Sequence, residues 1–209
     1  MARAFAEIAF TPSVRAVQEQ MGSAKAYANM LEPGPTEGNL LSAPEAEFIG
    51  ARDGFYQASV SETDWPYVQF RGGPVGFLKV LDEETLAYAD FRGNRQYVSK
   101  GNLEKNDRIS LIFMDYPNQR RLKILGRVTF VDAETDPDLV AKVAMPDYRG
   151  KIERVVVIKI AGFDWNCPQH IPRRLTLEEL EEHLAPLRRK LAELTAENQE
   201  LKAFLGRKD

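Results

Sequence analysis

The spacing of hydrophobic residues predicts a β-rich body followed by a long helix. Between residues 54 and 166, apolar and polar residues alternate in short runs, which is typical of half-buried strands. Strands this dense, joined mostly by turns, favour a barrel or sandwich over a doubly wound parallel sheet. The expected strands are residues 55–61, 67–70, 76–81, 86–90, 109–115, 121–131 and 155–165.

Helices are expected before and between these strands. Thr11 followed by Pro12 predicts a helix start, because a hydroxyl N-cap precedes a proline at the first helical position; this helix should continue to near residue 31. Ser42 and Glu45 are placed to form a capping box for a second helix ending near residue 54. Two further helices are expected at residues 95–106 and 136–144.

Leucines repeat at alternating spacings of three and four residues near the end of the chain. With Leu177 at heptad position a, Asn198 also takes an a position, which favours a parallel two-stranded coiled coil between subunits. Thr176 and Glu179 should form a capping box, and Pro186 should kink the helix or restart it. The alternative is an amphipathic helix lying on its own domain, but such a helix usually carries a wider apolar stripe.

The amino-acid composition disfavours several classes of function. With 44% hydrophobic residues, 28% charged residues and a net charge of −3, the chain is typical of globular proteins, and nucleic-acid binding is disfavoured because it needs excess Lys and Arg. A single cysteine, Cys167, excludes an internal disulfide, and the two histidines, His170 and His183, leave little for metal chemistry. No unbroken apolar run suits a secretory signal or membrane helix, so we expect no membrane contact and a cytoplasmic location.

The first polar cluster interrupts a strand pattern with two glycines and a proline. Arg71 is followed by Gly72, Gly73, Pro74 and Val75. Glycines in a strand pattern indicate a bulge or a backbone that a ligand approaches closely. The alternative is a tight connection between two strands.

The second cluster lies where a strand ends and a helix is expected. The strand ends at Asp90, Gly93 turns the chain, and the helix should begin at Asn94, Arg95 and Gln96. A helix N-terminus offers free N–H groups, and an added guanidinium suits a phosphate. The alternative is that Asn94 simply caps the helix.

The third cluster places two cations on one face of a strand. Arg121 and Lys123 are two residues apart, so their side chains should point to the same side. The alternative is a solvated face of an edge strand, where lysine discourages aggregation.

The order and spacing of these clusters resemble the pyridoxamine 5′-phosphate oxidase-like family of flavin-binding split barrels. The closest stretch, residues 104–128, has a helix ending in Asn-x-Arg, a core strand ending in Phe, a loop, and a basic strand ending in Gly. Residues 165–174 also resemble the closing segment of one oxidase-related branch. The resemblance implies a mainly β fold with flanking helices, which is a split β-barrel.

Three parts of the chain follow from this reading. Residues 1–53 form an N-terminal helical segment that packs on the barrel, and residues 54–174 form the barrel. Residues 175–209, which lie outside the resemblance, form the heptad helix.

The resemblance also implies a homodimer with FMN in grooves between its subunits. Arg95 and Gln96 would hold the FMN phosphate, assisted by Arg121 and Lys123. The other residues that the resemblance assigns to the cofactor are Arg71, Gly73, Pro74, Val75, Asp90, Asn94, Asn166, Gln169 and His170. Of these, Asn166, Gln169 and His170 would approach the flavin from the other subunit.

The chain departs from the oxidase in ways that bear on the substrate. Gln96 stands where the oxidase has the second residue of a basic pair, and Pro74 stands where the oxidase has an arginine before its apolar strand. We therefore do not expect pyridoxamine phosphate as the substrate. The leading hypothesis is an FMN-dependent oxidoreductase that takes electrons from NAD(P)H and acts on an unidentified small molecule, with His170 as a candidate proton donor.

Two other hypotheses stay open. One is a non-catalytic flavin carrier or sensor that uses the heptad helix to reach a partner. The other is a related cofactor, deazaflavin or haem, in the same groove. Haem is disfavoured because only His170 could serve as an axial histidine.

Overall fold

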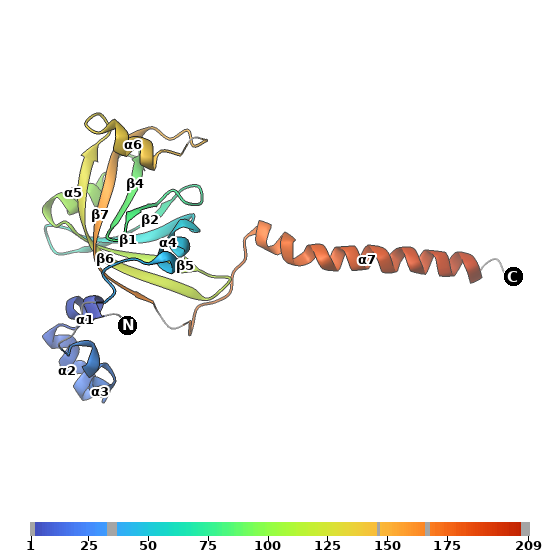
Figure 1. Ribbon diagram of the computed structural model, residues 1–209, viewed down its shortest axis with the longest axis horizontal. Coiled ribbons are helices and arrows are strands. Elements are labelled where there is room, and N and C mark those ends of the chain that lie inside the picture. Colours follow the sequence, from blue (N-terminus) through green and yellow to red (C-terminus); the bar gives the residue numbers. More distant parts are fainter. Residues whose placement is uncertain (1–2, 33–36, 146, 166–167, 206–209) are drawn as a thin grey trace. The chain divides into compact units, whose positions relative to one another are not determined.

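A seven-stranded antiparallel sheet forms the body of the molecule (Figure 1). The computed structural model describes residues 3–32, 37–145, 147–165 and 168–205. The strands follow the order β2-β1-β5-β6-β7-β4-β3, and the sheet does not close on itself. The predicted mainly β split barrel is therefore confirmed. The strands are β1 (Gly54–Val60), β2 (Pro66–Gly72), β3 (Lys79–Asp82), β4 (Thr85–Phe91), β5 (Arg108–Asp115), β6 (Arg120–Asp132) and β7 (Ile152–Trp165).

The chain divides into two compact units. The first comprises residues 1–115 and 120–169 and contains all seven strands of the sheet. The turn between β5 and β6 is not part of it. The second comprises residues 116–119 and 170–209, and most of it is one long helix.

The interior of the barrel is filled by side chains that alternate along the strands. Phe55 on β1 lies at its centre, with ring centroids 5.7 Å from Phe77, 5.6 Å from Tyr88 and 5.2 Å from Phe113. On β6, Leu122 and the residue two positions later are fully buried. Because aromatic rings bury large areas, this cluster joins strands from both halves of the open sheet.

The N-terminal helices are shorter than expected. These are α1 (Arg3–Ala9), α2 (Pro12–Gln20), α3 (Ala24–Tyr27), the 3-10 turn η1 (Ala28–Met30) and α4 (Ala43–Gly50). Thr11 caps α2 as predicted, its hydroxyl accepting from the backbone N–H of Val14 at 3.4 Å. The continuation to residue 31 is wrong, because Gly22 adopts a left-handed conformation (φ 72°) that cannot belong to a helix.

Helix α1 packs closely on β7. Its residues Ala4, Phe5 and Ala6 are buried. A Cβ atom added at Gly162 of β7 would lie 2.8 Å from the backbone nitrogen of Phe5. A glycine is therefore required there for the helix to approach the strand.

Two short helices follow β4 and β6. The helix α5 (Val98–Lys105) begins three residues later than predicted, whereas α6 (Pro137–Val143) lies close to its predicted bounds. Asp136 caps α6 through a 2.9 Å bond from the backbone N–H of Leu139. The buried Val143 then packs on small side chains of β4 and β7, so that β4 is covered on both faces.

The last helix, α7 (Leu177–Leu205), contains 29 residues. Its predicted capping box is confirmed: the backbone N–H of Thr176 donates to Glu179 Oε2 at 2.8 Å, and the N–H of Glu179 donates to Thr176 Oγ1 at 3.1 Å. The helix does not restart at Pro186 but runs through it. No helix among the described residues is both long and apolar enough to cross a membrane.

Glu45 links α4 to the end of β7. The backbone N–H of Ser42 donates to its Oε2 at 3.0 Å, which completes the predicted capping box, and Trp165 Nε1 donates to its Oε1 at 2.7 Å. Burial alone would raise the pKa of Glu45, but the bonds from Ser42 and Trp165 hold this pKa below its ordinary value of 4.5. The folded state therefore favours the charged carboxylate.

We predict that Glu45→Gln lowers the free energy of unfolding by about 1–2 kcal/mol at neutral pH, because charge-assisted bonds become neutral ones. The stabilisation by the carboxylate is fully present above the ordinary pKa of 4.5 and is lost as pH falls through the lower pKa of the folded state. The gap between variant and parent should therefore shrink below pH 4.5. Urea unfolding across this pH range measures it.

Glu47→Gln serves as the matched control, because Glu47 lies on the same helix but is exposed. A pH-independent gap for Glu45→Gln, or an equal gap for Glu47→Gln, would contradict the role of the buried carboxylate.

Candidate functional site

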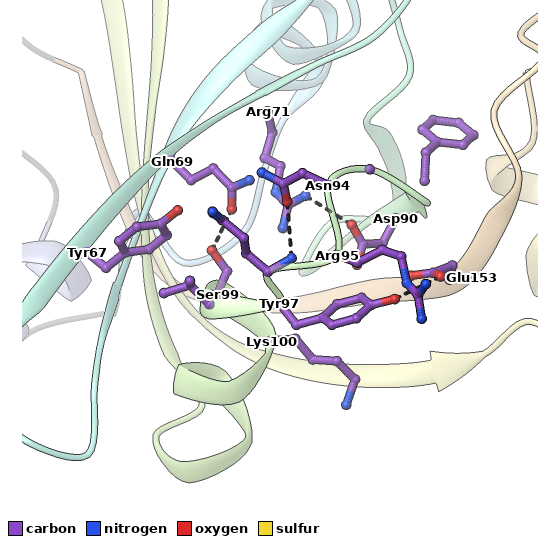
Figure 2. Close-up of a pocket in the computed structure, with 14 residues that line it drawn as sticks. Tyr67, Gln69, Arg71, Asp90, Asn94, Arg95, Tyr97, Ser99, Lys100 and Glu153 are labelled. Atoms are coloured by element: carbon purple, nitrogen blue, oxygen red, sulfur yellow. Dashed lines mark hydrogen bonds and ion pairs between the residues drawn. The ribbon is translucent and has the colours of Figure 1, made fainter.

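A polar pocket opens between β2, the loop after β4 and the start of α5 (Figure 2). Its volume is about 260 Å³. It is lined by Tyr67, Gln69, Arg71, Asp90, Phe91, Gly93, Asn94, Arg95, Gln96, Tyr97, Val98, Ser99, Lys100 and Glu153. Five residues that the sequence assigned to a cofactor, Arg71, Asp90, Asn94, Arg95 and Gln96, thus lie together.

Strand β2 supplies one wall through alternate residues. Tyr67, Gln69 and Arg71 are two residues apart and pair across to three buried residues of β1, so they face the barrel interior. Of these three, the resemblance assigns only Arg71 to the cofactor and leaves out Tyr67 and Gln69. Their period of two along a strand was the signal that could have found them.

The loop after β4 has an unusual backbone. Arg95 and Tyr97 have φ values of 62° and 54°, in the left-handed region that few residues other than glycine adopt. Asn94 Oδ1 accepts from the backbone N–H of Gln96 at 3.2 Å (Figure 2). The expected helix start at Asn94 is therefore wrong: left-handed residues cannot enter a helix, so α5 begins at Val98 and Asn94 does not cap it.

A buried carboxylate organises the deep end of the pocket. Asp90 Oδ1 accepts a hydrogen bond from Arg71 Nη1 at 3.0 Å, and Asp90 Oδ2 accepts one from Arg154 Nη1 at 2.7 Å. Because Arg71 belongs to the edge strand β2 and Asp90 to β4, this ion pair spans the opening of the split barrel. Burial alone would lower the pKa of Arg154, but its bond and attraction to Asp90 raise the pKa above its ordinary value. The folded state therefore favours the charged guanidinium of Arg154.

The second carboxylate of the pocket is also engaged. Glu153 Oε2 lies 3.3 Å from Arg154 Nη2, and its Oε1 accepts from the hydroxyl of Tyr97 at 3.0 Å. The guanidinium of Arg154 lies 5.3 Å from the centre of the Tyr97 ring. Both carboxylates are thus held by positive or hydrogen-donating groups, which reduces their repulsion of an anion in the pocket.

Unused donors remain around the opening. Among the described residues, the guanidinium of the exposed Arg95 has neither a hydrogen bond nor an ion pair. The Nε of Arg71 is buried without a hydrogen-bond partner within the same described part of the chain. The first turn of α5, which contains Ser99 and Lys100, adds the backbone N–H groups that every helix start leaves unpaired. This donor set suits an anionic group such as a phosphate.

Arg121 and Lys123 do not reach this pocket within one chain. Across β5 and β1, Lys123 is aligned with Phe70, the neighbour of Arg71, so it lies on the opposite face of the sheet from Arg71. Lys123 Nζ instead lies 3.2 Å from Asp164 Oδ2. Strand β6 is paired on both sides, so the alternative of an edge strand is wrong.

The glycine cluster after β2 forms a tight connection. The backbone N–H of Gly73 donates to the carbonyl of Asp53 at 2.9 Å, and the N–H of Phe77 donates to the carbonyl of Pro74 at 2.9 Å. A Cβ atom on Gly73 would lie 2.7 Å from the Phe77 ring. Contact within the chain thus accounts for this glycine, and neither Gly73, Pro74 nor the exposed Val75 lines the pocket.

The closing segment is described only in part. Asn166 and Cys167 lie outside the described residues. Gln169 and His170 are exposed, and His170 has a left-handed backbone with φ 66°. His170 belongs to the second unit, where the carbonyl of Ile171 accepts from Gln119 Nε2 at 2.7 Å.

The comparisons with known proteins concern this same β-rich region. The sequence model of the family described as pyridoxamine 5′-phosphate oxidase matches residues 45–165, which is more than half of the chain. The chain belongs to this family. The family match contains every residue that lines the pocket.

Several solved structures are similar to this member of the pyridoxamine 5′-phosphate oxidase family. HupZ from Group A Streptococcus has 13% identity and a TM-score of 0.48, covering 65% of this chain and 100% of its own. General stress protein 26 from Bacillus anthracis has 13% identity and a TM-score of 0.45, covering 57% and 88%. An FMN-binding protein from Syntrophomonas wolfei has 11% identity and a TM-score of 0.45, covering 71% and 97%. No curated protein matches the sequence.

Some residues of the site gave no usable signal in the sequence. Glu153 and Arg154 reach the pocket because β7 pairs with β4, which places Arg154 opposite Asp90. They are separated from Asp90 by more than sixty residues, and no local pattern relates them. Lys100 could have been suggested by its place in the first turn of a helix next to a phosphate-type cluster.

We predict that Asp90→Ala lowers the free energy of unfolding by about 3–5 kcal/mol, because Arg71 loses its counter-ion and the buried Arg154 keeps only the more distant carboxylate of Glu153. Urea unfolding at neutral pH measures the change. Asp107→Ala is the control: its pair with Arg127 is exposed, so a loss of only about 0–1 kcal/mol is expected. Equal losses for the two variants would contradict a central role for Asp90.

Proposed function

We propose that this protein binds FMN and places the phosphate in the pocket between β2, the loop after β4 and α5. The observation that supports this most directly is the Arg95 guanidinium at the opening, which has no partner in the described part of the chain, beside two carboxylates that other groups already hold. A phosphate monoester carries a charge of about −1.5 to −2 at neutral pH, so it needs such an excess of donors.

Each group of the pocket would have a separate task. Arg95 would donate to the phosphate oxygens, with Lys100 and the first backbone N–H groups of α5 completing the cradle. Asp90 and Arg154 would hold Arg71 in place rather than contact the ligand. Bound FMN would supply hydride or electron transfer, which is chemistry of the cofactor rather than of the protein.

We further propose that the protein is an oxidoreductase acting on a small molecule. Membership of the pyridoxamine 5′-phosphate oxidase family supports this reaction class. His170 remains our candidate for proton transfer at an imidazole nitrogen, and Gln169 and Asn166 remain candidates for contact with the ring.

The proposed cofactor site would be completed by a second copy of the chain. Tyr56, Val68 and Phe70 are exposed on the outer face of β1 and β2, and Phe70 is 57% exposed. Exposed apolar patches of this kind mark interaction surfaces, and family members are typically dimeric. Lys123 is aligned with Phe70 on this face, so the dimer we propose would present Lys123 and Arg121 toward the other subunit.

We predict that Arg95→Ala weakens FMN binding by about 10-fold to 100-fold, because charge-assisted bonds to the phosphate contribute about 1.5–3 kcal/mol. Riboflavin, which lacks the phosphate, should bind parent and variant alike. Titrations followed by flavin fluorescence measure both affinities. The matched control is Arg149→Ala, because Arg149 is exposed and does not line the pocket, whereas Arg92 lies 3.7 Å from Glu153 of the pocket.

An equal loss of riboflavin and FMN binding in Arg95→Ala would contradict the phosphate assignment. Unchanged FMN binding in this variant would contradict the site itself.

The proposed reaction class predicts that the FMN-loaded protein loses its oxidised-flavin absorption bands when NADH or NADPH is added without oxygen. Absorption spectroscopy follows this loss. FMN is added in less than the amount that saturates the protein, so that the bands come from bound rather than free flavin. Bands that persist with both nucleotides would contradict direct reduction by a nicotinamide donor.

A further inference from the structure

Helix α7 carries an apolar seam that nothing in the described chain covers. No residue of α7 is buried, and Leu187, Leu191 and Leu201 are 66%, 67% and 62% exposed. A seam of this size on one face of a helix is unfavourable in water, because burying each leucine side chain removes a large apolar area from the solvent. The seam therefore needs a partner.

The seam has the spacing of a coiled coil over the whole helix. Positions a and d of the heptad hold leucine throughout, except for Asn198. Pro186 falls at position c, away from the seam, and α7 continues through it. The 29 residues of the helix cover about four heptads, the number that makes a heptad pattern significant.

Asn198 favours one arrangement of the partner. In a parallel in-register pair, position a faces position a, so the two Asn198 amides can hydrogen-bond each other. In an antiparallel pair, position a packs against position d, and each Asn198 would face a leucine without a partner. A buried amide without a hydrogen bond is destabilising, so the parallel pair is preferred.

The charges beside the seam favour the same arrangement. In a parallel pair, position g of one helix faces position e of the next heptad in the other. Glu197 at g then faces Lys202 at e, which is an opposite-charge contact on both sides of the pair. Of the other two pairs, Lys190 at g faces Thr195 at e, and His183 at g faces Arg188 at e; neither joins opposite charges, so Glu197 and Lys202 carry this preference.

We propose that α7 pairs with α7 of a second copy of this chain as a parallel, in-register, two-stranded coiled coil. With a rise of 1.5 Å per residue, this rod would be about 43 Å long. The pairing rests on α7 alone and does not depend on FMN binding.

Cysteine cross-linking of the full-length chain tests the pairing, in a Cys167→Ser background. Leu194→Cys places a thiol at position d, where the two Cα atoms of a parallel pair come close enough for a disulfide. Ala196→Cys is the matched control, because position f of the same heptad points away from the partner. We expect Leu194→Cys to form disulfide-linked dimers at least about tenfold faster at low protein concentration, since a disulfide needs Cα atoms within about 7 Å.

A second variant separates pairing of α7 from a dimer formed elsewhere. Leu191→Glu, added to Leu194→Cys, should abolish the fast cross-link, because it places a charge at position a of the seam, three residues before the thiol. The residue is exposed, so the fold of the barrel, followed by near-ultraviolet circular dichroism, should not change.

The proposal is overturned if Leu194→Cys and Ala196→Cys cross-link equally, or if neither does. The first result would show chance encounter of helices, and the second would show that α7 binds antiparallel, on its own chain or on another protein. Persistence of the cross-link in the variant with Leu191→Glu would also overturn it.

Discussion

The pairing of Asp90 with two arginines is the interaction on which the site of this molecule depends. Strands β2 and β4 are separated by four other strands in the sheet, and the open barrel leaves them facing each other. Asp90 joins them through Arg71 and also holds Arg154 of β7. Charges this buried are stable only when their geometry is good and their remaining bonds are met. Asp90 satisfies this requirement with a donor on each oxygen, whereas the Nε atoms of Arg71 and Arg154 have no hydrogen-bond partner among the described residues.

Other contacts across the same opening act with it. The buried hydroxyl of Tyr88 on β4 donates to Gln57 Oε1 on β1 at 2.7 Å, and Ser99 of α5 donates to Gln69 of β2 at 2.8 Å. These polar bonds lie next to the aromatic cluster around Phe55, to which Tyr88 also belongs. The pocket lies where the polar contacts reach the surface.

The electrostatics of the pocket follow from this construction. Asp90 and Glu153 are engaged by arginines and by Tyr97, whereas Arg95 is held on a left-handed loop without a partner in the described chain. An uncommon backbone held by its surroundings is frequent at ligand sites. The structure thus separates the groups that maintain the site from the group that is available to a ligand. That separation supports our proposal that Arg95, rather than Arg71, binds the phosphate.

Features that depend on local spacing can be predicted from the sequence: the strand alternation, the caps at Thr11, Ser42 and Thr176, and the leucine spacing of α7. These features involve residues within one or two turns or one strand, so periodicity and hydrogen-bonding chemistry suffice to predict them. The resemblance to a family added Arg95 and Asp90, which the structure places in one pocket.

Which charged side chains meet depends instead on how the strands pair in three dimensions. Lys123 and Arg71 both belong to basic, strand-forming segments, yet the register across β6, β5, β1 and β2 places them on opposite faces of the sheet. Arg154 meets Asp90 because β7 pairs with β4, although 64 residues separate them. Strand pairing is set by the packing of the whole core. A shift of one residue in the register of a strand moves each of its side chains to the other face of the sheet, so no local pattern contains this information.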